Sequence, residues 1–498
     1  MVQITQPPPQ VLQLHLYVQT VHTIYIFCTY CATIHICTIC TYTVHRLYIL
    51  QIKGKLIMES IEVTLPHDWA ELTPGDIFPK VTGDNRSAFL QYTDKVSDEN
   101  YMHWERAKFV AAPAGLKDSE AWYLARELRK LSAKQTKVKA ESGEYFTLYR
   151  PNYVDKYLRY IDMYAGGQFL LDQASDTVKA EKQKYLTRGI MEEAIASSQL
   201  EGADTSRKYA KKMIAENKKP TNRSEWMIMN NYKTLQMVEE NYKDRELSIE
   251  MLLELQSTLT ENAIEEEDRG RFREDEDDIV VKYAGKIAHT PPKHEFLIKE
   301  LERLIKYVND NENFIHPVIK AIQIHFWIGY LHPFVDGNGR LARTLFYWYM
   351  IKNEYWAMAY LPISMVIKRA PKQYTYSYIY SEQDNYDLTY FLDYNIKKIV
   401  KSIDEFVEYV DKIKAENQEV EVKLQKLIVL NDRQKQSIHY LLADDTQYLT
   451  VTTHQNMNRI SRGTSRTDIL SLEESGLLKP VKFGTSIRYY ASDQLKGL

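Results

Sequence analysis

Apolar residues recur at every third or fourth position through most of the chain after Tyr153, with short polar breaks between the runs. This spacing places apolar side chains on one face of an α-helix. The pattern is clearest in four segments: KAEKQKYLTRGIMEEAIASSQL, IEMLLELQSTLTENA, KHEFLIKELERLIKYVND and HPVIKAIQIHFWIGYL. We therefore predict a mainly α protein with a helical domain over residues 151–428, in which one helix covers about residues 185–202.

Two further regions flank this helical domain. Residues 58–150 mix Pro and Gly turns with one helix-period stretch, SEAWYLARELRKLSAKQTK, and predict an N-terminal α/β region without a catalytic constellation. Residues 429–498 predict, in order, a helix, a short strand, a helix, a turn, a helix and two strands. The last two strands should form a hairpin that turns at Phe483-Gly484-Thr485.

Residues 1–57 differ from the rest, because nothing before Arg46 is charged and few residue types are used. The four cysteines form two CxxC pairs with five residues between them, whereas ribbon-type zinc sites have about twelve or more. A membrane anchor or signal segment conflicts with the many polar residues and the missing basic start. A dinucleotide repeat in the coding sequence alternates purines and pyrimidines. Its translation explains why His, Tyr and Cys alternate with Thr, Ile, Val and Ala. We therefore predict that translation starts at Met58 and that residues 1–57 are a non-native or disordered low-complexity extension.

The charge and cysteine content narrow the function classes. The 498 residues carry a formal net charge of -3, so a field that attracts polyanions over the whole chain is excluded. Any nucleic-acid contact must then come from a local patch. No cysteine follows Lys53, so the body of the protein has no disulfide framework. We expect a cytoplasmic protein without stable membrane association.

The stretch HPFVDGNGRLAR, His332–Arg343, separates two apolar helix-period runs. Pro333 disfavours the helical conformation at His332, so the first helix should end there. DGNG supplies residues that tolerate positive φ, and the second helix should begin near Arg340. On these residues alone, a tight turn between two core helices, with His332 as a cap, accounts for the stretch.

The neighbouring residues add an anion site to this turn. A glycine-flanked loop that enters a helix points backbone N–H groups outward, and Arg340 and Arg343 lie three positions apart at the same end. Asp336 beside them can hold a Mg²⁺ ion that bridges phosphate oxygens. His332 follows a helix C-terminus, whose dipole should stabilise the imidazolium that a general base forms. These parts fit phosphoryl-type transfer.

The stretch resembles the signature of Fic-domain proteins, HxFx[DE]GNGRxxR, at every specified position. Upstream, GRFREDEDDIVVKYAGKIAHTPPKHEFL is similar to the family's arginine turn and β-hairpin flap. Downstream, YLPISMVIKRAPKQYTYSYIYSEQDNYDLTYFLDYNI is similar to the helices that follow the motif, so the likeness covers residues 185–400. The resemblance implies a Fic helical bundle core with a small β-hairpin flap.

The resemblance also implies an activity, which is transfer of AMP from ATP to a Ser, Thr or Tyr hydroxyl of a protein, with release of pyrophosphate. His332 would deprotonate the hydroxyl, and Asp336 would hold Mg²⁺ between the α- and β-phosphates. Asn338 would contact the α-phosphate, and the arginines would hold the β- and γ-phosphates. Phe334 would anchor the loop in the core. The implied nucleotide-binding residues are Gly337, Asn338, Gly339, Arg340 and Arg343.

A second motif, ASSQLEG, contains Ser197-x-x-x-Glu201-Gly202 at the end of a helix-period run. On its own, a Glu before Gly is usually a solvated carboxylate ahead of a C-cap glycine. The segment also resembles the inhibitory motif of the family, [ST]xxxE[GN]. That resemblance implies that Glu201 pairs with Arg343 in the resting enzyme and blocks the γ-phosphate. In some members the same glutamate positions water for removal of AMP.

Several alternatives stay open. The transferred group can be UMP, phosphate or phosphocholine, although the complete GNGRxxR with a matching glutamate favours AMP. De-AMPylation and a DNA-binding regulator that merely carries a Fic core are the other candidates. The intact His332, Asp336 and Asn338 favour an enzyme. We expect a target protein, or the chain itself, as acceptor, and a homo-oligomer as a further state.

Two histidines and a group of tyrosines are further candidate site residues. His325 lies two helical turns before His332, but a transition-metal site with Asp336 is disfavoured because the arginines repel a cation. We expect His325 to pack in the core. His289 belongs to the expected flap, which can bind a target backbone by β-augmentation. The tyrosines of KQYTYSYIYS either pack the core or line a nucleotide base.

The C-terminal region resembles winged-helix domains. SRGTSRTDILSLEESGLL is similar to a recognition helix, and KPVKFGTSIRYYA to a wing hairpin. Such domains read DNA with a helix in the major groove, and many instead bind protein or form dimers. Both alternatives stay open here. The side chains expected to meet phosphates are Arg462, Arg466, Lys482 and Arg488.

Overall fold

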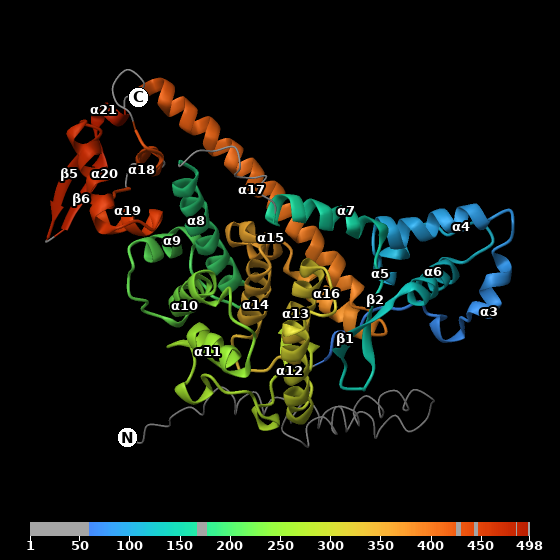
Figure 1. Ribbon diagram of the computed structural model, residues 1–498. Helices are drawn as coiled ribbons and strands as arrows, with labels where there is room; N and C mark the ends of the chain where they lie inside the picture. Colours follow the sequence, from blue (N-terminus) through green and yellow to red (C-terminus); the bar gives the residue numbers. More distant parts are fainter. Residues whose placement is uncertain (1–58, 167–176, 425–429, 443–446, 485, 497–498) are drawn as a thin grey trace, which may run out of the picture. The chain divides into compact units, whose positions relative to one another are not determined.

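Contacts divide the chain into two compact units. The small unit includes residues 59–60 and 284–286, and Lys286 donates to the Glu59 carboxylate at 2.7 Å. The large unit holds all the other described residues, including every residue of the predicted site. The predictions for residues 1–57 lie outside the described residues. The computed structural model describes residues 59–166, 177–424, 430–442, 447–484 and 486–496 (Figure 1).

The large unit is mainly α, as predicted. Its centre is the pair α13 (Pro317–Leu331) and α14 (Asn338–Lys352), which pack on each other (Figure 1). α13 is buried on nearly all sides and reads as an almost continuous apolar run, as expected of a helix surrounded by others. Phe326, Trp327 and Trp348 are fully buried at this pair.

Nine further helices build the helical domain around this pair. Their N-terminal caps follow from the sequence, because Ser206, Asn222 and Ser248 each accept a hydrogen bond from a backbone N–H three residues ahead. Among the described residues these helices are α7 (Asn152–Ile161), α8 (Thr177–Leu200), α9 (Arg207–Ala215), α10 (Arg223–Met237), α11 (Ile249–Thr260), α12 (His294–Asn309), α15 (Ile363–Lys368), α16 (Pro371–Gln383) and α17 (Thr389–Leu424).

The N-terminal region combines short helices with one hairpin. The prediction that its helix continues to Lys137 is wrong, because the helix ends at Ser132 and the next residues pair in a strand. Trp122 is fully buried in a small core of its own, and buried Arg126 forms an ion pair with Asp384. The hairpin strands β1 (Lys134–Lys139) and β2 (Tyr145–Leu148) are antiparallel. The helices are α3 (Pro74–Ile77), α4 (Arg86–Thr93), α5 (Trp104–Ala107) and α6 (Asp118–Ser132).

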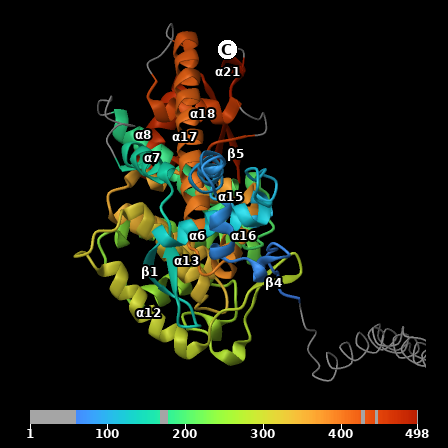
Figure 2. The ribbon, with the colours of Figure 1, turned by 90° about the vertical axis from the view of Figure 1, so that its right-hand side faces the viewer.

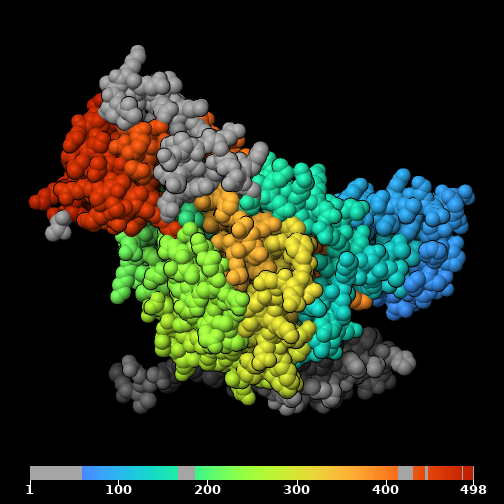
Figure 3. All heavy atoms as spheres, in the orientation of Figure 1, coloured from blue at the N-terminus to red at the C-terminus, as the bar shows by residue number. Residues whose placement is uncertain are grey.

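Two other features agree with the expected architecture. A two-stranded sheet of β3 (Val281–Tyr283) and β4 (Lys286–His289) lies where the flap hairpin was predicted. α17 has 36 residues and is the long charged helix that leads to the C-terminal module, as two views show (Figures 1 and 2). The space-filling view shows the segments of α10 to α13, green to yellow, closely packed on one face (Figure 3).

The C-terminal module follows the predicted order of elements. Its core includes Ile438, Leu472 and Tyr489. Where the short strand was predicted, Leu449 forms only an isolated bridge with Tyr489. The winged-helix assignment, and the choice between DNA and protein as its partner, stay predictions. The elements are α18 (Asp432–Leu442), α19 (Val451–Asn458), α20 (Arg462–Glu474), β5 (Leu478–Phe483), β6 (Ser486–Ala491) and α21 (Asp493–Lys496).

The length and hydropathy of the helices bear on membrane insertion. In the described ranges, each helix is either too short or too polar to reach from one side of a membrane to the other.

Candidate active site

The predicted turn lies between the two central helices. α13 ends at Leu331, and His332 adopts a left-handed conformation (φ 47°) while its N–H donates to the carbonyl of Ile328 at 2.9 Å. The helix therefore ends where Pro333 predicted it to end. α14 begins at Asn338, two residues before the predicted Arg340, because Gly337 at φ 92° already caps the helix.

Asn338 closes the loop on itself. Its side-chain carbonyl accepts from the N–H of Phe334 at 2.9 Å, and its NH₂ donates to the carbonyl of Phe334 at 2.7 Å. Both halves of the buried amide are thus used within the loop, and no contact to a phosphate is needed to explain its presence. Phe334 is fully buried against Phe272, so its predicted role as an anchor is confirmed.

Arg273 holds the same loop from the outside. Its Nε donates to the carbonyl of His332 at 2.8 Å, and its Nη2 donates to the carbonyls of Leu331, at 3.3 Å, and Pro292. The backbone N–H of Arg273 also donates to the carbonyl of Pro333 at 2.9 Å. A single buried guanidinium therefore binds the carbonyls that follow the end of α13, where helical partners are lacking.

His332 is neutral in this arrangement. Burial, and then the nearby His289, lower the pKa of His332 to about 3. The dipole at the end of α13 predicted the opposite direction, and burial outweighs it. An uncharged imidazole can accept a proton, so His332 is in the state that a general base requires at neutral pH.

Asp336 is paired with two arginines. Arg340 donates to one carboxylate oxygen at 3.0 Å, and the exposed Arg223 of α10 donates to the other at 2.6 Å. No group of three or more acidic, His or Cys side chains that could hold a metal occurs in the described part of the chain. A single partly exposed carboxylate still fits Mg²⁺, because this ion usually binds one or two carboxylates together with substrate phosphates.

Arg340 and Arg343 are both buried beneath the first turn of α14. Arg340 donates to the carbonyl of Leu259 at 2.7 Å as well as to Asp336, and its Nε has no hydrogen-bond partner among the described residues. Nη1 of Arg343 also has no such partner. Buried donors without acceptors are uncommon, so this end of α14 has unused capacity to bind an anion.

Arg343 makes its other bonds to α8. Its Nε donates to the Ser197 hydroxyl at 2.8 Å, and its Nη2 donates to the Ser197 carbonyl at 3.0 Å and to Glu201 at 2.8 Å. Burial opposes the charge, but Glu201 and other acceptors hold the pKa of Arg343 above its usual range. The pair Glu201–Arg343 that the sequence predicted is therefore present.

Glu201 lies directly over the N-terminus of α14. A Cβ atom placed on Gly339 would be 2.1 Å from a carboxylate oxygen of Glu201, so a side chain at that position would displace the carboxylate. Gly202 follows at φ 90° and ends α8, as a C-cap glycine does. The carboxylate thus occupies a place where a helix N-terminus attracts negative charge.

The remaining candidates have structural partners. His325 is buried, its Nε2 lies 2.8 Å from the hydroxyl of Tyr374, and it belongs to the core as expected. His289 at the end of β4 bonds to Glu382 and to the carbonyl of Tyr330, both at 2.7 Å. Tyr374 packs in the core against His325.

Three residues at this site were not predicted from the sequence. Arg273 lies in the segment GRFRED, where the arginine turn was noticed but no contact was assigned. Gln256 of α11 donates to the backbone carbonyl of Asp336 at 3.1 Å, and Arg223 binds the Asp336 carboxylate. Both come from helices far away in the sequence, and nothing near them indicates the contact.

Comparisons with known proteins agree with the motif. Residues 246–350 match the Fic/DOC family. Over 111 residues the chain is 31% identical to "Protein adenylyltransferase fic-1" of Caenorhabditis elegans, which is 22% of this chain and 20% of that protein. Over 101 residues it is 31% identical to "Protein adenylyltransferase Fic" of Drosophila persimilis, with 20% and 18% covered. The chain spans about a fifth of the length of the curated relatives it matches.

Two solved structures are also similar. A Fic family protein from Desulfovibrio desulfuricans G20 has 16% sequence identity and a TM-score of 0.43, with 69% of this chain and 97% of that chain covered. Fic-1 (residues 134–508) from C. elegans has 21% identity and a TM-score of 0.40, with 51% and 71% covered.

The role of Asn338 in the loop can be tested by its removal. Asn338→Ala leaves the N–H and the carbonyl of Phe334 without partners, and each buried unpaired group costs about 1–3 kcal/mol. We expect the free energy of unfolding to fall by about 2 kcal/mol or more, measured by urea denaturation. Asn353→Ala at the partly buried end of the same helix is the control and should cost less. Equal losses would contradict the role of Asn338 as the clamp of the loop.

Proposed function

We propose that this chain, which carries a Fic domain, transfers AMP from ATP to a hydroxyl side chain of a protein. The observation that carries the proposal is the position of a neutral His332 beside a helix N-terminus with two buried, incompletely bonded arginines. The backbone N–H groups at a helix N-terminus bind phosphate oxygens, and an attacking hydroxyl needs a nearby base. The curated relatives named adenylyltransferases support the choice of AMP.

In the proposed reaction, AMP passes from ATP to the acceptor hydroxyl. The acceptor hydroxyl oxygen attacks the α-phosphorus, and its proton passes to the imidazole of His332. The bond between the α-phosphorus and the bridging oxygen breaks, and pyrophosphate leaves with that oxygen. Arg340 and Arg343 neutralise the charge that develops on the leaving group. Arg273 keeps His332 in place through the carbonyls of the loop.

A magnesium ion is part of the proposal. Asp336 would hold it, and the ion would neutralise phosphate charge when bound. Arg223 and Arg340 each bind one oxygen of this carboxylate, so the metal would share Asp336 with these arginines or replace one of them.

Autoinhibition by Glu201 is the second part of the proposal. Glu201 bonds to Arg343 and covers Gly339, which are two of the residues proposed to bind the outer phosphates. A carboxylate and a phosphate cannot both lie there, because both are negative and the space fits one of them. The resting protein therefore holds ATP, if at all, in an unproductive pose.

Labelling with [α-³²P]ATP tests both parts. Glu201→Gly should increase protein-bound label about tenfold or more, because a contact worth about 1.4 kcal/mol changes an equilibrium tenfold. His332→Ala in the Glu201→Gly background should abolish the label, and [γ-³²P]ATP should leave none on protein. Glu354→Gly, at the other end of α14, is the matched control and should have no effect. Equal labelling by the original chain and Glu201→Gly would reject autoinhibition.

The low pKa of His332 predicts the pH profile of the Glu201→Gly variant. A histidine with a pKa of about 3 stays deprotonated far below the ordinary value near 6.5. The kcat/KM for ATP reports groups of the free enzyme, so it should stay level from about pH 8 down to about pH 5. A fall to half near pH 6.5 would show that His332 is not desolvated as described, or that it is not the base.

A further inference from the structure

α8 and α14 meet along a ladder of polar contacts in an otherwise apolar core. On α8 the contact residues are Glu193, Ser197 and the following Glu201, each four positions from the next and hence on one side of the helix. On α14 they are Arg343 and Tyr347, also four apart. Ser197 and Glu201 bind Arg343, whereas Glu193 contacts Tyr347 and lies outside the proposed phosphate site.

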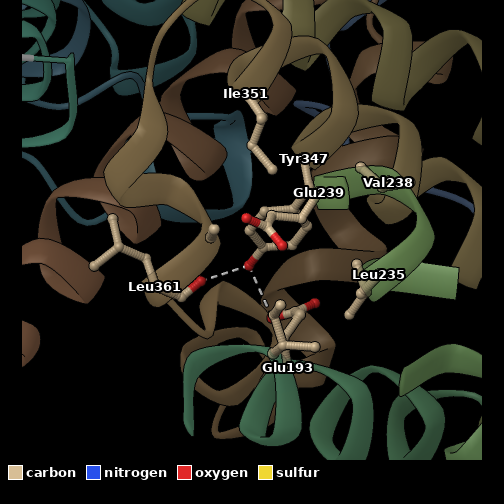
Figure 4. Close-up of a pocket in the computed structure, with 9 residues that line it drawn as sticks. Glu193, Leu235, Val238, Glu239, Tyr347, Ile351 and Leu361 are labelled. Atoms are coloured by element: carbon tan, nitrogen blue, oxygen red, sulfur yellow. Dashed lines mark hydrogen bonds between the residues drawn. The ribbon is translucent and has the colours of Figure 1, made fainter. Parts of the chain in front are cut away.

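Glu193 is buried, with 3% of its surface exposed. One carboxylate oxygen accepts from the backbone N–H of Ser364 at 2.9 Å and lies 2.8 Å from the hydroxyl oxygen of Tyr347. The other oxygen contacts the hydroxyl of Ser364. The Tyr347 hydroxyl lies also 2.7 Å from the carbonyl of Leu361, and Figure 4 shows both of its contacts.

The number of hydrogens available to the contacts around Glu193 favours its neutral form. Three oxygen–oxygen contacts exist, namely Glu193–Tyr347, Tyr347–Leu361 and Glu193–Ser364. The hydroxyls of Tyr347 and Ser364 supply two hydrogens for these three contacts, so with an ionised Glu193 the Tyr347 hydroxyl would share one hydrogen between Glu193 and Leu361. The N–H of Ile363 already donates to Tyr347 at 2.9 Å and cannot serve these contacts. A protonated Glu193 supplies a third hydrogen, so that each of the three contacts has its own.

The surroundings favour the same neutral form. Burial raises the pKa of Glu193, and the contacts with Ser364 and Tyr347 and the charge of Arg343 only partly offset it. Arg343 is itself paired with Glu201. Glu239, from the turn Val238–Tyr242, lines the same cavity of about 10 Å³ and pairs with Arg459 (Figure 4). Glu193 thus faces Tyr347 and Arg343 from α14, Ser364 from α15 and Glu239 from this turn.

We propose that Glu193 is a positioning residue, which as a neutral carboxylic acid seats α8 on α14 so that Glu201 reaches Arg343. This inference rests on the proposed function, because it extends the autoinhibitory contact by one residue. Loss of the proton leaves three oxygen contacts with two hydrogens and puts an unpaired charge in the core. Since the pKa is raised, inhibition is complete at low pH and weakens as the pH rises through it.

Tyr347→Phe is the first test, because it removes only the hydroxyl that Glu193 contacts. Loss of one buried hydrogen bond, about 1 kcal/mol, should raise label from [α-³²P]ATP about fivefold. In the Glu201→Gly background the same change should alter labelling less than about twofold, because no inhibition remains to be released. Tyr349→Phe, on the same helix, is the control and should have no effect in either background. A similar change, or a loss of label, in both backgrounds would overturn the proposal.

The proton on Glu193 is tested separately. The ratio of label on the original chain to label on Glu201→Gly should rise with increasing pH, and Glu193→Gln should make the ratio independent of pH. The infrared difference spectrum of the original chain minus Glu193→Gln should contain the carbonyl band of a protonated carboxylic acid near pH 7. Absence of that band would refute the inference whatever the activity. Failure of Glu201→Gly to raise labelling would refute autoinhibition, and absence of label from both chains would refute the proposed AMP transfer; neither outcome would alter the band.

Discussion

The structure around the site depends on the burial of one guanidinium, that of Arg343. A charge in the core is unstable unless it is paired and hydrogen-bonded. Here Ser197 and Glu201 supply that compensation from α8, so one contact both stabilises the protein and covers the proposed phosphate site. In the proposed function a nucleotide phosphate would replace Glu201, because it offers Arg343 the same kind of partner. The proposed inhibitory contact and the proposed productive contact would then be two solutions to one electrostatic requirement.

The loop before α14 depends on backbone satisfaction in a similar way. Between the end of α13 and the start of α14, Leu331, His332, Pro333 and Phe334 have carbonyls without helical partners, and Arg273 and Asn338 supply the donors. These bonds fix the direction of the imidazole without contact to its ring. The chemistry therefore rests on residues that bind backbone atoms, which explains why an amide and a distant arginine accompany the motif.

Much of the site could be predicted because its parts are close in the sequence. His332, Gly337 and the two arginines fall within twelve residues, and helix periodicity places them at the meeting of two helices. The start of α14 was predicted two residues late, because the asparagine in DGNG read as a turn residue. The contacts of Arg223 and Gln256 could not be predicted, since they depend on how α10 and α11 pack. The charge state of His332 was also beyond reach, because burial, which decides it, is a property of the folded chain.

The missing side chain of Gly339 has a wider consequence. In the proposed function, Glu201 and an outer phosphate would compete for one volume, so the seating of α8 and productive nucleotide binding would be thermodynamically linked with opposite sign. By thermodynamic reciprocity, a partner that binds α8 and separates it from α14 would increase the affinity for ATP by the factor by which ATP increases the affinity for that partner. A protein that recognises the released helix would act as an activator without approaching the catalytic histidine.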